Sequence, residues 1–362
     1  MESYPDIGEG KNIFQYKEIS ADTFLGNSII LYGESKTGKS FVTNHLLKAI
    51  SKKVLFLMVV SQTAYQDKSF PITNYTETPL IYEDLDMDAI RRFRSMCKHR
   101  SETKIEARKL ENLRKGAKVL RKVFENIPLE MAKLNKILAA VRRIKKKELD
   151  CADCKDEKDE AENKMVKLYV YLMKIGLIYI RKNNIDISEY GSDVMSILFA
   201  NINTNFAIMF NDMGDKINSM PKKDRDYLAE LCTLSRHEGI TSIFLIQNPT
   251  QLNPTIRSNA HISVFTDPNT MMSYIDTQKI KHNRKLFTDA AKNILLDDMA
   301  RPKNQKRYTK ALFIKEENKI CYIVADKNGE QTMVGDKFIL KKIAKRKLDK
   351  KSCIMTSIKD YM

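Results

Sequence analysis

The fold class can be predicted from the stretch Gly33-Glu34-Ser35-Lys36-Thr37-Gly38-Lys39-Ser40. It follows the apolar, β-branched run Ser28-Ile29-Ile30-Leu31-Tyr32 and precedes a helical pattern over residues 41–50. A strand, a glycine-containing loop and a helix in this order direct backbone N–H groups and a helix N-terminus at one point, where a phosphate group can bind. The pattern therefore predicts a nucleotide-binding phosphate loop, with ATP as the expected nucleotide.

Two side chains of this loop have expected roles of their own. Lys39 brings a positive charge for the β- and γ-phosphates, and the hydroxyl of Ser40 is the expected ligand of Mg²⁺. The alternative interpretation is an ordinary glycine turn. The position of the loop between an apolar strand and a helix argues against that alternative.

Further apolar runs predict an α/β fold with a largely parallel sheet. They cover residues 54–60, 206–210, Ile240–Ile246 and 261–265. Near the C-terminus, residues 311–315 and 320–324 flank the polar stretch 316–319, which is the pattern of a β-hairpin.

The strand that should hold the metal ends in Phe206-Ala207-Ile208-Met209-Phe210-Asn211-Asp212. A phosphate loop needs a partner strand with an acid at its end, to hold the metal and to align a water for attack on the γ-phosphate. Asn211 stands where the first of two acids is usual, and an amide brings no charge. Either Asp212 takes on both roles, with Asn211 as a neutral contributor to the metal site, or metal binding is weaker and hydrolysis slower. The alternative interpretation is a core strand that ends in a surface turn.

Gln247 and Arg236 are the remaining candidate catalytic residues. Gln247 ends the predicted strand Ile240–Ile246, where its side chain could sense the γ-phosphate and orient water. Arg236 follows a predicted helix over residues 227–234, at an edge suited to reach the nucleotide of a neighbouring subunit. An exposed arginine is otherwise an ordinary surface residue.

A charged helical insertion is predicted over residues 84–190. Between Arg91 and Glu148 there are 20 Lys plus Arg against 6 Asp plus Glu, with apolar residues at helical spacing and a break at Ile127-Pro128. We expect one or two long helices there, then an acidic stretch over 151–162 and a helix over 164–180. The insertion is either an arm that contacts a polyanion or a solvated hairpin that braces neighbouring subunits.

The predicted organisation has four parts. Residues 1–83 and 191–330 form the ATPase domain, 84–190 the insertion, and 331–362 a basic tail. Cys151 and Cys154 have half of a zinc-site spacing, which Cys97 and His99 could complete, but four ligands are required and no second pair lies nearby.

Composition narrows the partners and the compartment. The net charge of +17 favours nucleic acid or an anionic membrane surface as a partner. No signal peptide and no membrane-spanning run are recognisable, and the six cysteines lack a disulfide framework, so a reducing compartment is expected.

Taken together, these motifs resemble those of the poxvirus-type DNA-packaging ATPases of large nucleocytoplasmic DNA viruses, a branch of the FtsK–HerA superfamily. The similarity lies in the segment from Phe206 to Lys216, in Ser235-Arg236-His237-Glu238-Gly239-Ile240-Thr241-Ser242-Ile243 with Gln247, and in Ile256-Arg257-Ser258-Asn259-Ala260. The insertion and Asn211 depart from the family pattern.

The resemblance implies a RecA-like three-layer P-loop NTPase fold of the ASCE type, and a homo-oligomeric ring that drives double-stranded DNA into a capsid by ATP hydrolysis. It also implies Arg236 as an arginine finger acting in trans, capsid or inner-membrane components as further partners, and a location in the viral factory of the host cytoplasm or in the virion. The alternatives are another FtsK/HerA-like DNA-pumping motor, or an ATP-binding assembly subunit with weak or no turnover. A small-molecule kinase is disfavoured because it has no use for the positive charge.

Overall fold

The computed structural model describes residues 4–8, 12–67, 70–150, 155–278, 283–302, 305–326 and 330–345. Two compact units are present, one of residues 1–98 with 204–362 and one of residues 99–203. We call them the sheet unit and the helical unit. The predicted insertion was placed at 84–190, so both limits of the helical unit lie later in the sequence than predicted.

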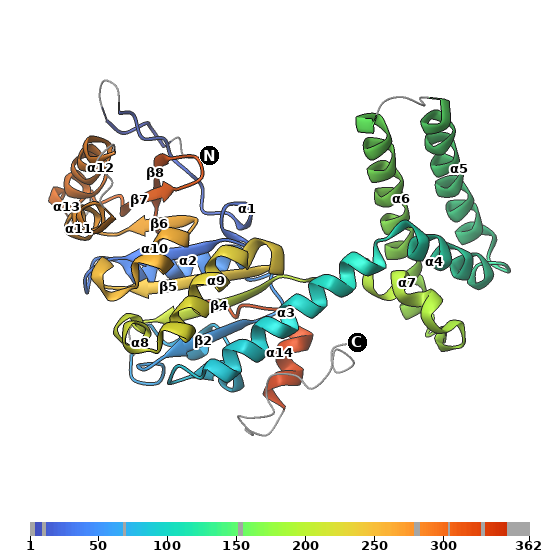
Figure 1. Ribbon diagram of the computed structural model, residues 1–362, viewed down its shortest axis with the longest axis horizontal. Helices are drawn as coiled ribbons and strands as arrows, with labels where there is room; N and C mark the ends of the chain where they lie inside the picture. Colours follow the sequence, from blue (N-terminus) through green and yellow to red (C-terminus); the bar gives the residue numbers. More distant parts are fainter. Residues whose placement is uncertain are drawn as a thin grey trace. The chain divides into compact units, whose positions relative to one another are not determined.

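The sheet unit is built on one sheet of eight strands (Figure 1). In chain order they are β1 (Ser28–Tyr32), β2 (Leu57–Ser61), β3 (Ile81–Tyr82), β4 (Phe206–Asn211), β5 (Ile240–Ile246), β6 (Ile262–Phe265), β7 (Thr309–Ile314) and β8 (Lys319–Val324). Their spatial order is β3-β2-β4-β5-β1-β6-β7-β8. The pairs from β3 to β6 are parallel, and β7 and β8 add an antiparallel hairpin.

The helices of the sheet unit are α1 (Ala21–Phe24), α2 (Lys39–Ile50), the first half of α3 (Met87–Ala107), α8 (Gly214–Ser219), α9 (Lys222–Glu238), α10 (Pro254–Asn259), α11 (Pro268–Gln278), α12 (Arg284–Ala290), α13 (Asp297–Ala300) and α14 (Lys337–Ala344). A π-helical turn, Ala291–Leu296, joins α12 to α13. Short 3₁₀ turns occupy Ile72–Asn74, Thr78–Leu80 and Pro249–Gln251.

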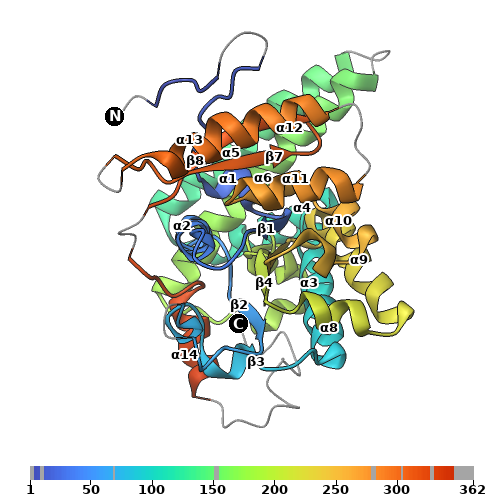
Figure 2. The same cartoon turned by 90° about the vertical axis from the view of Figure 1, so that its left-hand side faces the viewer.

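Each face of the sheet buries its own apolar layer. Because side chains alternate along a strand, Ile29 packs with Leu46 of α2, whereas Ile30 belongs to the cluster that contains Phe93 of α3 and Leu231 of α9. Figure 2 shows α2 on one side of the strands and α3 with α9 on the other. Burying each such side chain contributes about 1.5–3 kcal/mol. The three layers of the predicted fold are therefore present.

The position of β5 identifies the class of P-loop fold. This strand lies between β1, which precedes the phosphate loop, and β4, which ends in Asn211. The rings of Phe210 and Phe244 stack across β4 and β5 with centroids 4.7 Å apart. An extra strand between the loop strand and the acid-bearing strand defines the ASCE type, which confirms the predicted fold class.

Most strands agree with the sequence prediction, but the short strand β3 was not predicted and β2 begins later than expected. The strand was expected to begin at Val54 but begins at Leu57. Leu55 and Phe56 instead contact the chain near Gly335, since the amide of Asp336 donates to the carbonyl oxygen of Leu55 at 2.9 Å.

The helical unit contains the second half of α3, then α4 (Leu110–Val123), α5 (Pro128–Asp150), α6 (Lys155–Lys182), a 3₁₀ turn (Ser188–Val194) and α7 (Met195–Phe199). Its core includes Leu120, Leu172, Met173 and Ile197. Helices α4 and α6 approach closely at Gly176, where an added Cβ would lie 2.4 Å from a methyl carbon of Leu120.

The prediction of one or two helices between residues 91 and 148 was wrong, because three are present. The break at Ile127-Pro128 separates α4 from α5 as expected. A second break lies at Arg108-Lys109, where Lys109 has an extended backbone (φ −60°, ψ 138°). The Arg108 side chain donates to the carbonyl oxygen of Ala200 at 2.8 Å, so a tertiary contact fixes this break without any proline or glycine.

Several other sequence features can be placed only in part. Cys151 and Cys154 lie outside the described residues, and Cys97 is a buried free cysteine. Within the described ranges, no three His, Cys, Asp or Glu side chains gather as a metal site would require. Likewise, none of the described helices combines the length and apolarity that a bilayer span needs.

Candidate nucleotide site

The phosphate loop, residues 33–40, connects β1 to α2 at the carboxyl edge of the parallel strands. Gly38 has φ 98°, a conformation that favours glycine. A Cβ on Gly33 would lie 1.8 Å from the Thr266 Oγ1 atom, so no larger residue fits there. Helix α2 begins at Lys39 with no acidic residue in its first turn, which leaves its free N–H groups available to an anion.

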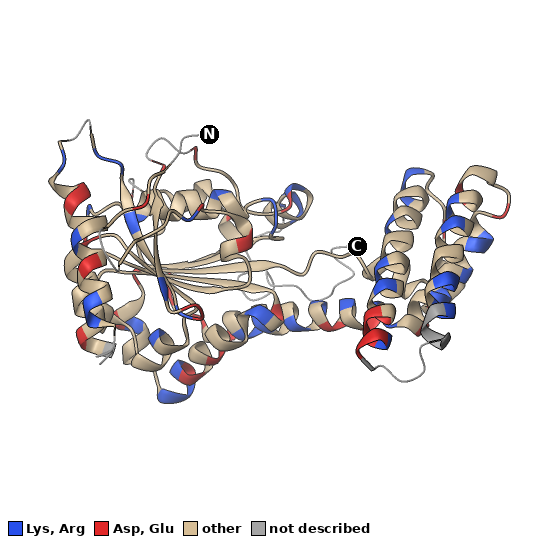
Figure 3. Ribbon diagram, turned by 90° about the horizontal axis from the view of Figure 1, so that it is seen from above, with Lys and Arg blue, Asp and Glu red and all other residues tan. Residues whose placement is uncertain are grey.

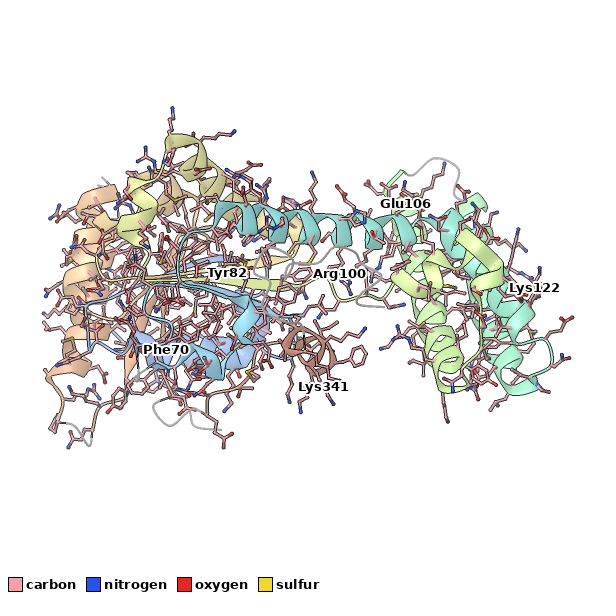
Figure 4. The ribbon with its side chains drawn as sticks, turned by 90° about the horizontal axis from the view of Figure 1, so that it is seen from below. Phe70, Tyr82, Arg100, Glu106, Lys122 and Lys341 are labelled. Carbon is pink, nitrogen blue, oxygen red and sulfur yellow. The ribbon has the colours of Figure 1, made fainter. Side chains whose placement is uncertain are left out.

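A cavity of about 380 Å³ opens over this loop. It is lined by Glu34, Ser35, Lys36, Gly38, Lys39, Ser40, Phe41, Asp67, Phe70, Asn211, Asp212, Leu245 and Gln247. The fold thus brings the ends of β4 and β5 to the loop, as the parallel sheet requires. Phe70, labelled in Figure 4, belongs to the apolar layer on the α2 side of the sheet. The volume lies in the range of small-molecule sites.

Lys39 and Asp212 face each other in this cavity, with Nζ 3.8 Å from Oδ1. Burial lowers the pKa of Lys39, and the negative charges of Asp212 and Asp267 partly offset that effect. A bound phosphate would add negative charge beside this partly buried ammonium. Asp212 adopts φ 52°, which is uncommon for an aspartate and turns its carboxyl group out of the end of β4.

Asn211 is buried, and its Nδ2 atom donates to the Ser61 hydroxyl at 3.0 Å. This side chain therefore joins the ends of β2 and β4. It brings no charge to the cavity, so the carboxylate that β4 and the residue after it contribute to the lining is that of Asp212.

The oxygen ligands that Mg²⁺ prefers are available in this cavity. The Ser40 hydroxyl and the Asp212 carboxylate both line it, and the ion commonly takes its other ligands from water and phosphate. The residues present fit a magnesium nucleotide.

Gln247 directly follows β5 and is exposed in the same cavity. Its backbone N–H donates to the Gln251 Oε1 atom at 2.9 Å, and the amide of Asn248 donates to the same oxygen at 3.0 Å. These bonds fix the backbone at the end of β5. The Gln247 side chain therefore extends into the cavity from a fixed backbone position, where a polar group could contact phosphate or water.

Arg236 lies in the last turn of α9, near the amino ends of the parallel strands and away from the phosphate loop. The prediction that it follows the helix was wrong, because α9 continues until Gly239 ends it in a left-handed conformation (φ 70°). Its Nε atom donates to Asn27 Oδ1 at 2.8 Å, and its Nη2 atom pairs with Glu316 Oε2 at 2.8 Å. The seven residues of β5 separate this end of the sheet from Gln247 by about 20 Å, so Arg236 cannot reach the cavity of its own chain.

Sequence reasoning missed a group of residues that supports the loop from β6 and β7. Lys310 is buried, and its Nζ atom donates to the carbonyl oxygens of Thr37 at 3.0 Å and Thr266 at 3.3 Å. Asp267 accepts from the Glu34 amide at 3.1 Å. Burial lowers the pKa of Lys310, and Asp298 and Asp267 oppose that shift.

A sequence signal existed for part of this group. Thr266 and Asp267 directly follow a predicted parallel strand, so their position at the carboxyl edge could have been inferred. Lys310 had no such signal, because it lies in the antiparallel hairpin and contacts the loop across 273 positions of sequence.

The chain is similar in sequence or in structure to several known proteins. Protein B354L of African swine fever virus is 22% identical over 315 residues, which cover 83% of this chain and 81% of that protein. The pCW3 conjugation coupling protein TcpA, solved with ATPγS, aligns with a TM-score of 0.36 and 12% identity over 93% of this chain and 68% of that one. The genome packaging NTPase B204 of Sulfolobus turreted icosahedral virus 2, with the same analogue, aligns with a TM-score of 0.37 and 11% identity over 82% of this chain and 96% of that one.

TM-scores of this size do not establish a shared fold, so the assignment of the architecture rests on the strand order and the loop. The family comparison is more extensive. Residues 161–350, which are 190 of the 362 residues and include β4 to β8, match the family described as "Poxvirus A32 protein". The chain therefore belongs to the Poxvirus A32 protein family.

Proposed function

We propose that this protein is an ATP-hydrolysing translocase that moves double-stranded DNA and packages a viral genome into the capsid. The observation that carries the proposal is the cavity in which the phosphate loop, Asp212 and Gln247 meet at the carboxyl edge of an ASCE sheet. Membership in a poxvirus protein family and the net charge of +17 support a viral role on a polyanionic substrate.

In this proposal the loop from Gly33 to Ser40 binds the phosphates through its backbone N–H groups. Lys39 neutralises phosphate charge, and Ser40 and Asp212 would hold Mg²⁺, which neutralises the charge that develops on the phosphates. Gln247 orients the attacking water, and Asp212 takes part in aligning it. These roles use side chains that already line one cavity.

Arg236 completes the site of a neighbouring subunit in an oligomeric ring. Its position about 20 Å from the cavity of its own chain leaves a neighbour's nucleotide as the target. The guanidinium must then leave Glu316 for the phosphate. The side chain is 43% exposed, so the ion pair is open to exchange.

A second candidate function is an ATP-binding assembly subunit with weak or no turnover. Asn211 favours it, because the amide is engaged with Ser61 and contributes no charge to metal binding. In that case nucleotide would stabilise the assembly without driving movement.

The proposed setting is the viral factory in the host cytoplasm, with the protein also associated with the virion. Capsid or inner-membrane components are the proposed partners of the ring.

Steady-state ATP hydrolysis with and without duplex DNA tests the proposal. The parent chain should turn over ATP and accelerate with DNA, whereas Lys39→Ala and Asp212→Asn should lose at least about 100-fold in kcat. A parent chain that binds nucleotide but hydrolyses none with any divalent metal would support the assembly subunit instead. Lys292→Ala, which removes an exposed lysine from the π-helical turn, is the matched control.

A further inference from the structure

A basic groove lies inside the helical unit, between α4 and α5. This cavity of about 250 Å³ is lined by Arg114, Ala117, Lys118 and Arg121 of α4, by Leu138, Val141 and Arg142 of α5, and by Tyr169 of α6. The lining contains four cationic side chains and no acidic one. We refer to it as the α4/α5 groove.

The three cations of α4 share one face of the helix. Residues 114, 118 and 121 are spaced by four and three positions, and they span about 10 Å along the axis. All three side chains are exposed, as is Arg142 on the facing helix. Ala117, Val141 and Tyr169 are buried, so the groove has an uncharged floor and a cationic rim.

Among the described residues of this unit, the groove cations have no acidic partner, unlike several nearby lysines. Lys115 pairs with Glu111, Lys133 with Glu130 and Lys164 with Glu160, each at 2.7 Å. In contrast, no ion pair to a described residue is present for the four groove cations. Their mutual repulsion is unfavourable, and an anionic ligand would relieve it.

The surrounding helices add to this positive field. Residues 110–147 contain 8 Lys or Arg besides the four groove cations, against 3 Asp or Glu. In Figure 3 the positions of Lys and Arg are coloured blue along the ribbons of these helices. Lys122, labelled in Figure 4, is engaged differently, since its Nζ atom lies 5.7 Å from the centre of the Tyr190 ring.

We infer that the α4/α5 groove binds the phosphodiester backbone of double-stranded DNA, an inference that rests on the proposed function. Arginine side chains bind phosphate oxygens in a two-pronged geometry, and three cations in a row can follow successive phosphates. Contacts of this kind do not depend on base sequence, which suits a motor that moves along any DNA.

The groove favours a duplex over a single strand. Proteins that bind single strands stack the bases on exposed aromatic rings. The aromatic residue of this groove, Tyr169, is only 7% exposed and lies in the floor. A ligand that presents its phosphates and keeps its bases paired fits this surface.

An anionic membrane is a poorer match. Helices that bind membranes combine cations with exposed apolar side chains that enter the lipid. The exposed large apolar residues of the helical unit are Ile105, Leu129, Tyr171 and Ile178, and none lines the groove. A concave cationic surface fits the convex phosphate backbone of a duplex better than it fits a flat bilayer.

The test measures the affinity of the full-length chain for a 40-base-pair duplex over a series of salt concentrations. The groove variant is Arg114→Gln/Lys118→Gln/Arg121→Gln, and the matched control is Lys115→Gln/Lys133→Gln/Lys164→Gln, which removes the same charge from ion-paired positions of the same unit. We expect the groove variant to lose at least about tenfold in affinity and about 2.7 in the slope of log K against log salt. The control variant should keep its affinity within about twofold of the parent and show a smaller change in slope than the groove variant.

Other outcomes separate the inference from the proposed function. A parent chain that binds no DNA at any salt overturns the proposed function and this inference together. A parent that binds with a steep salt slope, and a groove variant that keeps both affinity and slope, overturns the groove alone. If the groove variant lost binding to phosphatidylserine vesicles but kept its affinity for DNA, the groove would be a membrane-binding surface, and the inference would be wrong. ATP turnover without DNA should be unchanged, and the helical content should equal that of the parent.

Discussion

The ammonium group of Lys310 donates to the carbonyl oxygen of Thr37 at 3.0 Å, from β7 to the apex of the phosphate loop. The carbonyl of Thr37 and the N–H of Gly38 belong to the same peptide group, so a cation on the oxygen strengthens the N–H as a donor. Lys310 is thus a positioning residue for the loop.

Lys310→Met should weaken binding of both ADP and ATP by about fivefold, because roughly 1 kcal/mol of loop organisation is lost. Lys310→Arg should recover part of this loss. Titration calorimetry measures both affinities. Equal affinities for parent and Lys310→Met, with the thermal midpoint lowered, would make Lys310 only a structural residue.

Arg236→Ala should leave nucleotide affinity unchanged and lower kcat by at least about 100-fold, as expected for an arginine finger. Arg284→Ala, which removes an exposed arginine paired with Asp276, is the control. Mixing Arg236→Ala with Lys39→Ala should restore part of the activity, since some interfaces then combine an intact loop with an intact arginine. Absence of any recovery at every mixing ratio would contradict a site shared between subunits.

Glu316→Gln should weaken the hold on Arg236 that the present ion pair provides. The Glu316 carboxylate itself is not expected to stabilise the transition state. We therefore expect kcat to stay equal or to rise by up to about threefold. Steady-state assays of ATP hydrolysis would measure the change in kcat. A large decrease would show that Glu316 itself is needed at the subunit boundary.

Asn211→Asp should lower the Mg²⁺ concentration that gives half-maximal ATP turnover, because a second carboxylate would then stand at the end of β4. The aspartate can still accept a hydrogen bond from Ser61, so the strand pairing is expected to survive. A metal titration of the parent and the variant compares them. An unchanged magnesium requirement would show that this side chain does not reach the metal.

Glu238→Gln should lower the free energy of unfolding by about 3 kcal/mol, because it leaves the buried guanidinium of Arg94 without its main counter-charge. The two side chains are bonded at 2.7 Å, and the hydrogen bond to Glu238 is the main cause of the raised pKa of Arg94. Urea denaturation measures the change. Lys216→Gln, which breaks the exposed pair with Asp84, should have little effect on the midpoint.

The parts of the fold that rest on local patterns could be predicted from sequence. Strand β1 was delimited correctly because an apolar run ends at a glycine, and β5 because a run of seven apolar or small residues ends at the polar Gln247. The meeting of Asp212 and Gln247 at one cavity follows from parallel pairing, which places strand ends at the same edge.

The rest depended on contacts between distant segments. The break between α3 and α4 is fixed by the bond from Arg108 to Ala200, which no local residue preference signals. Lys310 reads as an ordinary lysine of a hairpin until the strand order places β7 next to β6. The α4/α5 groove likewise depends on packing, because Arg114 of α4 and Arg142 of α5 line one cavity although they are 28 positions apart in sequence.

Movement along duplex DNA driven by ATP can be measured as the displacement of a third strand from a DNA triplex. The parent chain should displace the strand with ATP and Mg²⁺, whereas replacing ATP with the slowly hydrolysed analogue ATPγS, or using the Lys39→Ala variant, should abolish displacement. A parent chain that hydrolyses ATP in the presence of the duplex, yet displaces no strand at any protein concentration, would contradict the proposed movement along DNA.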